Sequence, residues 1–260
     1  MRVLITGGGG FLGTKICSRL ARLGIPTISY SRHRHPHLDG LAVHQVVGDI
    51  ADGITLKRAL TGVDCVFHVA AKVGVSGNTS DFERTNVDGT VCLLQACREL
   101  GIGRLVFTSS PSVVFDGRDQ SGIDESVPYP LRYLADYPRT KARAERLVLE
   151  AARSGQIRAV ALRPHLIWGP GDPHLVSRIL AVAKAGRLSF VGSGEKLVDA
   201  VYVDNAADAH ITAMLKLFEP NDAVIGRAFF ITNHEPLPLR QIINSILAAA
   251  RLPCLLYTSD

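Results

Sequence analysis

Short apolar runs rich in β-branched residues alternate along the chain with longer segments in which apolar residues recur at a helical period. The longer segments predict helices and include 11–23, 81–100 and 138–153. Because the short runs are apolar throughout rather than alternating, both of their faces are expected to be buried. The pattern therefore predicts a doubly wound α/β fold, with a parallel sheet covered by helices on both faces. The six predicted strands are 2–6, 26–30, 43–47, 64–70, 104–109 and 158–163.

The regular alternation of strand and helix ends near Pro164, and turn residues become frequent after it. We expect residues 1–165 to form mainly one large domain and residues 166–260 mainly a smaller lobe, with a helix at 174–186. Segment 198–218 is expected to give a further strand and helix that return to the core of the large domain.

Two details of the C-terminal half carry separate expectations. Asp204 belongs to the residue types that cap helix N-termini, and it is expected to cap the helix within 198–218. The last residues, CLLYTSD at 254–260, do not look like the end of such a lobe. We therefore expect a truncated chain or a foreign tail.

Composition narrows the class of protein. With 260 residues, of which 47% are hydrophobic, the chain can bury a substantial core. A net charge of +5, with basic residues spread along the chain, argues against binding of nucleic acid by an extended basic face and favours a small anionic ligand. The five cysteines form no CxxC pair, and no apolar run reaches the roughly 20 residues of a membrane span. A soluble, cytoplasmic protein is expected.

The first predicted strand runs directly into the sequence TGGGGFLG at 6–13, which places Gly7, Gly10 and Gly13 just before a helix. Glycines at this spacing let the backbone turn tightly and approach a pyrophosphate, whose charge is stabilised by the free amides of the helix N-terminus. Because the loop follows a strand, opens a helix and begins a βαβ pattern, residues 1–165 are predicted to bind a dinucleotide.

The residues at the end of the second strand indicate which dinucleotide is bound. In the usual site an acidic residue about 20 positions after the glycines holds the adenosine ribose, and here Ser31 takes that place, followed by Arg32. A carboxylate would repel a 2′-phosphate, whereas a hydroxyl and a guanidinium can bind one. The sequence therefore predicts a preference for NADP(H), with NAD(H) as the alternative.

The remaining polar residues after this strand are explained differently. Arg34 would add a second positive charge near the phosphate. The three nearby histidines are expected to be solvated loop residues rather than metal ligands, and no metal site is predicted. These histidines are His33, His35 and His37.

A second candidate constellation is the YxxxK pair formed by Tyr137 and Lys141 at the head of a predicted helix. Residues four apart lie on one helix face, where the lysine cation can lower the pKa of the phenol from its free value of about 10. The pair therefore predicts a proton donor. A surface tyrosine and lysine without function is the alternative.

Serines gather at the end of the strand 104–109, the edge at which doubly wound folds bind their ligands. A hydroxyl there could hold a substrate carbonyl oxygen beside the tyrosine. Ser110 is the first candidate and Ser112 the second, whereas Ser109 is expected to satisfy local backbone groups. A nucleophilic serine is not expected, because no GxSxG motif surrounds these positions.

With the glycine loop, the serine-rich strand end and the YxxxK pair in this order, the chain resembles the extended short-chain dehydrogenase/reductase family. That family includes NAD-dependent epimerases and dehydratases and 3β-hydroxysteroid dehydrogenases, and the likeness covers essentially residues 1–250. It implies a catalytic group of Ser110, Tyr137 and Lys141, with Asn86 supporting the site through water. The resemblance and the motifs together assign the cofactor to Gly7, Gly10, Phe11, Leu12, Gly13, Ser31, Arg32, Asp49, Ile50, Ala70, Ala71, Tyr137, Lys141 and Pro164.

Within the family, the segments 109–117, 163–172 and 201–210 look most like those of bacterial reductases that act on 2-alkyl-3-oxoalkanoates in long-chain olefin biosynthesis. The sterol 4α-carboxylate 3-dehydrogenases are a near neighbour. The resemblance implies NADPH-dependent reduction of the 3-keto group of a 2-alkyl-3-ketoacid. It further implies a homodimer formed through the helices at 81–100 and 138–153, and association with other enzymes of the olefin pathway.

Other functions remain open at this point. A steroid dehydrogenase would need the same apolar slot, for which 174–192 supplies side chains. A nucleotide-sugar epimerase is disfavoured by Ser31 and Arg32, and a non-catalytic cofactor sensor by the intact YxxxK pair. The candidate contacts to a lipid-like ketone substrate are Lys72, Ser112, His165 and Trp168.

Overall fold

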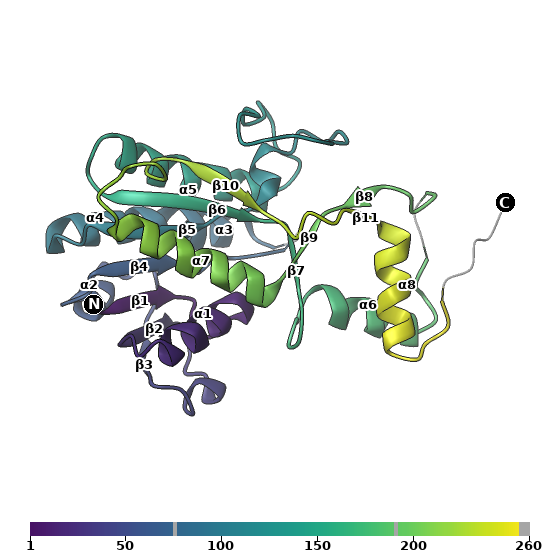
Figure 1. Ribbon diagram of the computed structural model, residues 1–260, viewed down its shortest axis with the longest axis horizontal. Coiled ribbons are helices and arrows are strands. Elements are labelled where there is room, and N and C mark those ends of the chain that lie inside the picture. Colours follow the sequence, from purple (N-terminus) through teal and green to yellow (C-terminus); the bar gives the residue numbers. More distant parts are fainter. Residues whose placement is uncertain (75–76, 190–191, 255–260) are drawn as a thin grey trace.

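The computed structural model describes residues 1–74, 77–189 and 192–254. Its centre is a seven-stranded sheet in the order β10-β6-β5-β4-β1-β2-β3, in which every pair of neighbours is parallel (Figure 1). This confirms the doubly wound class. The strands are β1 (Val3–Thr6), β2 (Thr27–Ser31), β3 (Val43–Val47), β4 (Cys65–His68), β5 (Arg104–Thr108), β6 (Arg158–Pro164) and β10 (Ala228–Ile231).

Each face of the sheet packs against its own set of helices. On one face, α1 (Phe11–Arg22) and α7 (Val203–Phe218) contribute side chains such as Ile16 and Met214 to one core. On the other, a second core includes side chains such as Leu56, Leu93 and Val148. Burial of each such side chain stabilises the fold by about 1.5–3 kcal/mol, which explains why the strands are apolar on both faces. The helices of this second face are α2 (Gly53–Leu60), α4 (Gly89–Leu100) and α5 (Asp136–Arg153).

The helix predicted at 81–100 is present without a break, but it is not α-helical throughout. It consists of the short helix α3 (Thr79–Phe82), a π-helical turn η2 (Glu83–Asp88) and α4. A π-helical turn inserts an extra residue and often lies at a functional site. Here it carries Asn86, whose side chain is buried.

A small lobe lies beyond the carboxyl ends of the strands (Figure 1). Its helices α6 (Leu175–Lys184) and α8 (Leu239–Ala249) contact one another. The lobe's strands are paired in two short sheets, the first antiparallel and the second parallel. These strands are β8 (Leu197–Val198) with β11 (Leu237–Pro238), and β7 (Leu166–Trp168) with β9 (Ala200–Tyr202).

Three features of the C-terminal half differ from the sequence-based expectation or add to it. After the lobe the chain returns to the main sheet and adds beside β6 the strand β10, which was not predicted. Asp204 does not cap α7, which begins one residue earlier at Val203; its carboxylate instead lies 3.6 Å from both Lys15 and Arg19 on α1. The expected unusual tail, 254–260, lies outside the described residues from position 255 on.

Within the described ranges, no helix has the length and apolar character that a membrane crossing requires. The five cysteines are free thiols, and burial raises the pKa of Cys17, Cys65 and Cys97 to about 12. These buried thiols therefore behave as packing residues.

Candidate active site

The glycine loop adopts a shape that only glycine tolerates. Gly7 has a left-handed backbone (φ +71°), and a Cβ on Gly13 would lie 2.2 Å from the carbonyl oxygen of Gly7. The helix α1 begins with no side-chain cap at Gly10, so the amides of its first turn remain available to an anion. The loop is therefore shaped for close approach of a pyrophosphate.

A cleft of about 1070 Å³ runs from this loop along the carboxyl ends of the strands to the lobe. It brings together all but one of the residues predicted from the sequence to bind cofactor or act in catalysis. The exception is Asn86, which is buried and is not among the lining residues. The predicted residues that line it are Gly7, Gly10, Phe11, Leu12, Gly13, Ser31, Arg32, Asp49, Ile50, Ala70, Ala71, Ser110, Tyr137, Lys141 and Pro164, and the candidate substrate contact His165.

At the end of the cleft beside β2, two polar side chains have no described partner. The hydroxyl of Ser31 is buried without a hydrogen-bond partner among the described residues. Arg32 is exposed and has no partner in the described part of the chain, whereas Arg34 is paired with Asp39 at 2.8 Å. An unpaired guanidinium beside an unpaired hydroxyl fits a phosphate that each could bind. Arg34 does not supply the free second charge expected of it.

The opposite wall at this end is fixed by Asp49. Its carboxylate accepts a hydrogen bond from the amide of Ala51 at 2.9 Å and pairs with Arg84 at 2.8 Å. The main-chain carbonyl of Asp49 accepts from the hydroxyl of Tyr30 at 2.8 Å. These contacts hold Asp49 and Ile50 at the edge of the cleft.

The expectation that all three histidines after β2 are solvated is wrong for His35. A Cβ on Gly9 would lie only 1.9 Å from the His35 ring, so the ring packs directly on the glycine loop and lines the cleft. Burial lowers the pKa of His35, and the neighbouring His37 and His33 lower it further. His37 reaches Thr14 of α1 at 3.0 Å. No group of potential metal ligands occurs in the described ranges.

At the other end of the cleft, Tyr137 lies in the first turn of α5 and faces Ser110 at the end of β5. Burial raises the pKa of Tyr137, and a hydrogen bond with Ser110 lowers it. The Ser110 hydroxyl is itself held by Ser112, through the amide at 3.2 Å and the hydroxyl at 2.8 Å. The prediction of a lowered tyrosine pKa is wrong for this structure, because burial has the larger effect.

Lys141 is almost fully enclosed, with 2% of its surface exposed. Its Nζ donates a hydrogen bond to the carbonyl oxygen of Thr108 at 2.6 Å and lies 4.1 Å from the centre of the Phe107 ring. Burial lowers the pKa of Lys141 to about 7, and the charge of Glu145 opposes this shift. The ammonium is therefore held at a considerable cost in desolvation.

This cost predicts that Lys141→Met stabilises the cofactor-free protein. Between pH 7 and 10.5 the unfolded chain binds a proton at this lysine that the folded chain releases, so the stability of the wild type rises with pH across that window. One pKa unit corresponds to about 1.4 kcal/mol and 1 kcal/mol to about 2–4 °C in a chain of this size, so Tm should rise by at least about 5 °C at pH 7.

The measurement is the difference in Tm between variant and wild type, by calorimetry at several pH values from 7 to 10.5. The difference should shrink as the pH rises, because the unfolded lysine then loses its proton as well. An equal or lower Tm of the variant at pH 7 would show that the lysine is not held at a desolvation cost.

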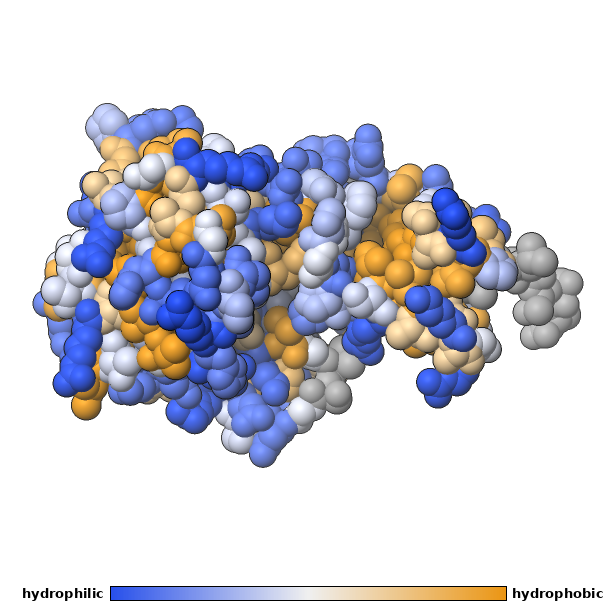
Figure 2. Space-filling view, turned by 90° about the horizontal axis from the view of Figure 1, so that it is seen from below, coloured by the Kyte–Doolittle hydropathy of each residue, from blue (hydrophilic) through white to orange (hydrophobic). Residues whose placement is uncertain are grey.

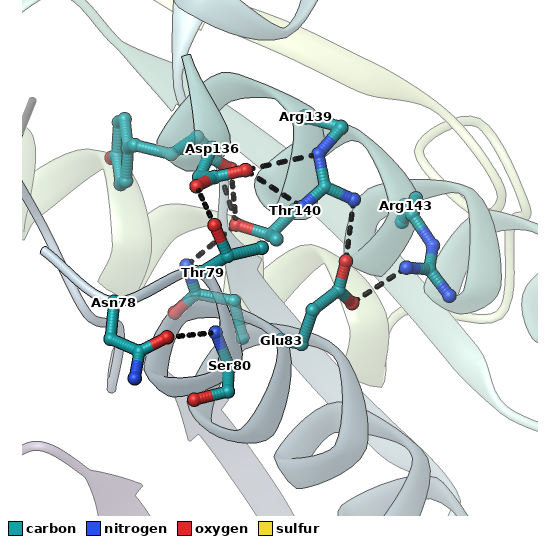
Figure 3. Close-up of polar contacts among 10 residues, drawn as sticks. Asn78, Thr79, Ser80, Glu83, Asp136, Arg139, Thr140 and Arg143 are labelled. Carbon is teal, nitrogen blue, oxygen red and sulfur yellow. Dashed lines mark hydrogen bonds and ion pairs between the residues drawn. The ribbon is translucent and has the colours of Figure 1, made fainter.

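The first turn of α5 is fastened to the segment that contains α3 and η2. Figure 3 shows Asp136 and Arg139 of α5 facing Thr79 and Glu83. Thr79 donates to Asp136 at 2.6 Å, and Arg139 pairs with both Asp136 and Glu83. Arg143, one turn further along α5, pairs with the second oxygen of Glu83. This network fixes the helix turn that carries Tyr137.

Asn86 extends the same connection into the protein interior. Its side-chain oxygen accepts from the amide of Lys72 at 2.7 Å, and its amide nitrogen donates to the Lys72 carbonyl at 3.1 Å and to the Thr140 hydroxyl at 2.9 Å. The side chain of Lys72 points elsewhere, to Asp81 at 3.8 Å, and Lys72 is not among the described lining residues. Asn86 thus positions the loop beside the cleft.

Three further sequence-based assignments need correction. Trp168 does not line the cleft among its described residues: it is 42% exposed and packs edge-on against Tyr202, 5.2 Å between ring centres. Ser112 supports Ser110 rather than lining the cleft. Ser109 lines the cleft, but its side chain does not satisfy local groups, because its hydroxyl is buried and has no described partner.

Several residues at the lobe end of the cleft were not predicted from the sequence. There His165 is joined by His174, Arg178 and Asp199. Burial lowers the pKa of His165, against an opposing effect of Asp199. Arg178 has no hydrogen bond or ion pair to any described residue. No motif marks these positions, since the lobe folds back over the cleft only in three dimensions.

The parallel sheet, the glycine loop and the cleft at the strand ends define an extended short-chain dehydrogenase/reductase. The chain belongs to the 3-beta hydroxysteroid dehydrogenase/isomerase family, whose model matches residues 4–251. The predicted family and enzyme class are thereby confirmed.

Two bacterial relatives are each 46% identical to the chain. They are the 2-alkyl-3-oxoalkanoate reductases of Shewanella oneidensis, over 255 residues, and Stenotrophomonas maltophilia, over 256 residues. The matches cover 96% and 97% of this chain, which spans 66% and 77% of the length of these relatives. The mouse sterol-4-alpha-carboxylate 3-dehydrogenase, decarboxylating, is 38% identical over 245 residues, covering 94% of this chain and 67% of that protein.

Among solved structures, MoeE5 in complex with UDP-glucuronic acid and NAD is similar to the whole chain. The TM-score is 0.83 at 28% identity, with 100% of this chain and 86% of that chain covered. The UDP-glucose 4-epimerase of Thermus thermophilus in complex with NAD gives a TM-score of 0.79 at 25% identity, covering 97% and 84%. A nicotinamide cofactor therefore fits the family and this cleft.

Proposed function

We propose that the protein catalyses NADPH-dependent reduction of the 3-keto group of a 2-alkyl-3-oxoalkanoate to the corresponding 2-alkyl-3-hydroxyalkanoate. The observation that carries this proposal is the 46% identity, over nearly the whole chain, to two reductases named for that substrate. The cleft supports it, because Ser110, Tyr137 and Lys141 line one end together.

In the proposed mechanism, bound NADPH supplies the hydride. Tyr137 donates a proton to the oxygen of the reacting carbonyl. A phenol of ordinary pKa, about 10, is already protonated at neutral pH, and burial raises the pKa of Tyr137 further. Ser110 donates a hydrogen bond to the same oxygen. Lys141 holds the nicotinamide ribose, and Asn86 keeps the neighbouring loop in place.

The preference for NADP(H) over NAD(H) is part of the proposal. It is supported by the buried, unpaired hydroxyl of Ser31 and by the free guanidinium of Arg32 at the adenosine end. No acidic side chain follows β2 in the position that would bind the ribose hydroxyls of NAD.

The substrates named for these relatives have one chemical feature in common. A 2-alkyl-3-oxoalkanoate and a 3-keto-4-carboxysterol each have a carboxylate on the carbon next to the reacting carbonyl, joined to a large apolar body. Arg178 is a cation without a described partner at the lobe end of the cleft, and we propose that it pairs with this carboxylate.

The lobe supplies apolar surface for the rest of such a substrate. Figure 2 shows a broad apolar area on the lobe that α6 and α8 build. The sequence of α6 is largely aliphatic, LVSRILAVAK, yet none of its residues is fully buried. A long alkyl chain or a sterol ring system could cover apolar side chains of this kind.

Turnover measurements test the proposal. Because β-ketoacids lose carbon dioxide in solution, the reaction is best followed in reverse, as reduction of NADP⁺ by a 2-alkyl-3-hydroxyacid. We expect faster turnover with this acid than with a 4-carboxysterol or with a 3-hydroxysteroid that lacks a carboxylate, and faster turnover with NADP⁺ than with NAD⁺. Preferred turnover of the 4-carboxysterol would favour the second candidate, a sterol dehydrogenase, which the 38% identity to the mouse enzyme supports.

The variant Arg178→Gln tests the carboxylate contact. A hydrogen bond to a charged group contributes about 1.5–3 kcal/mol, so KM for the hydroxyacid should rise by about tenfold or more, while KM for the uncharged steroid should not change. Equal effects on both substrates would remove Arg178 from this role. Absence of turnover with every alcohol and ketone, despite NADPH binding, would instead favour a cofactor sensor.

The proposed setting of the enzyme is cytoplasmic, as a homodimer that works beside other olefin-pathway enzymes. The dimer would use α4 and α5. On α5, Arg143, Arg146, Leu147 and Glu150 line part of a groove of about 460 Å³. Sedimentation at several concentrations would measure the association.

A further inference from the structure

A buried histidine that the proposed chemistry does not use lies at the carboxyl end of β4. His68 is 1% exposed, and its ring packs against Phe107 at 5.4 Å between ring centres. Each ring nitrogen faces a threonine hydroxyl: Nδ1 lies 2.8 Å from Oγ1 of Thr6, and Nε2 lies 2.9 Å from Oγ1 of Thr90. The imidazole therefore connects β1 to α4 through the interior.

The surrounding hydrogen bonds determine the protonation of this ring. Thr90 donates its hydroxyl hydrogen to the carbonyl oxygen of Asn86 at 2.7 Å, so it can only accept from His68, and Nε2 must carry the proton. Thr6 accepts from the amide of Ala70 at 3.1 Å and donates its own hydrogen to Nδ1. Every donor then has an acceptor, and the ring is neutral.

The electrostatic surroundings agree with a neutral ring. Burial, and to a smaller extent the charge of Lys141, lowers the pKa of His68 to about 3. The ring is enclosed by Thr6 from β1, Thr90 from α4, Phe107 from β5 and the cation of Lys141 from α5. The hydrogen-bond arrangement should therefore stay unchanged throughout the neutral pH range.

The chain of hydrogen bonds continues beyond Asn86. The Asn86 amide donates to the hydroxyl of Thr140, which in turn donates to the carbonyl oxygens of Asp136 at 2.8 Å and Tyr137 at 3.1 Å. One end of the chain is thus Thr6, the residue before the glycine loop. The other end is the helix turn that carries the proposed proton donor.

We propose that His68 is a positioning residue that holds the glycine loop and the first turn of α5 at a fixed spacing, so that the cofactor and Tyr137 meet the substrate in register. This inference depends on the proposed oxidoreductase function only where it is tested by turnover. A misplacement of about 1 Å between reacting groups can cost about 100-fold in rate, so the effect of breaking the chain should fall on kcat rather than on KM.

Matched variants at Thr90 separate the hydrogen bond from packing. Thr90→Val keeps the shape of the side chain but removes the hydroxyl, whereas Thr90→Ser keeps the hydroxyl and removes the methyl group. We expect Thr90→Val to lower kcat by about tenfold with KM and the Kd of NADPH within about threefold, and Thr90→Ser to retain most of the wild-type kcat. Equal losses in both variants would overturn the proposal.

The central variant is His68→Phe, which keeps a ring and removes both hydrogen bonds. We expect kcat to fall by about 10- to 100-fold, and addition of Thr90→Val to this variant to cause no further loss, because the chain is already broken. A purely structural role predicts that the two losses multiply, in which case the proposal fails.

Hydrogen exchange provides a test that needs no substrate and no change at the buried histidine. Addition of NADPH to the wild type should slow exchange of amides in η2 and the first turn of α4, because the chain transmits ordering from the glycine loop. Thr90→Val should lose this remote protection and keep that of the glycine loop itself. Equal remote protection in wild type and Thr90→Val would contradict the proposal, whatever the protein turns out to reduce.

Discussion

Replacement of Tyr137 by phenylalanine is expected to reduce turnover by about 100- to 10,000-fold, the usual contribution of a positioned general acid. The phenol is the group that would protonate the carbonyl oxygen, and it carries its proton at neutral pH because its pKa is not below the ordinary value of about 10. Phenylalanine fills the same space, so the Kd of NADPH, measured by fluorescence titration, should stay within about twofold.

A second tyrosine in the same region serves as the control. Tyr133 donates its hydroxyl to the carbonyl oxygen of Val113 at 3.2 Å and does not line the described cleft. Tyr133→Phe should therefore keep nearly full turnover. If Tyr137→Phe retained comparable turnover, Tyr137 would not be the proton donor, and Ser110 would become the first residue to test.

The second large effect is expected from Arg32→Glu, which should abolish or reverse the preference for NADPH. The change removes a charge-assisted contact of about 1.5–3 kcal/mol and places a carboxylate beside the 2′-phosphate, so the Kd of NADPH should rise by about 100-fold. The new carboxylate can accept hydrogen bonds from the two ribose hydroxyls of NADH, whose Kd should fall.

Arg34→Glu is the matched control for charge. It makes the same charge change two residues away, but at a side chain that pairs with Asp39 rather than remaining free. We expect at most about a threefold change in the Kd of NADPH, measured at the same ionic strength. An unchanged preference in Arg32→Glu would mean that the cluster after β2 is only solvated charge.

Much of the fold could be predicted from the sequence because its elements are encoded locally. All six predicted strands lie within about two residues of the observed ones, since continuous β-branched runs fit only a strand buried on both faces. The strand β10 escaped prediction because it is short, AFFI, and its apolar residues could equally belong to a loop packed on the core.

The residues of the candidate site also fall into two groups, those that local sequence predicts and those that it does not. The glycine loop and the YxxxK pair have fixed local spacings, so their residues could be identified without a structure. Arg178 and His68 could not, because their partners lie in other elements of the chain. The same reason explains the wrong expectations for Trp168 and Ser109, whose surroundings are set by packing.

The sequence by itself determined the order of the strands β1 to β6, the phosphate-binding loop and the identity of the proposed catalytic residues, since all of these depend on neighbours within a few positions. Only the tertiary structure decided the directions in which the pKa values of the catalytic side chains shift. Enclosure by distant segments raises the pKa of Tyr137 and lowers that of Lys141, against the simple expectation from their spacing. Desolvation depends on how completely the folded chain surrounds a group, and the order of residues along the chain does not specify that.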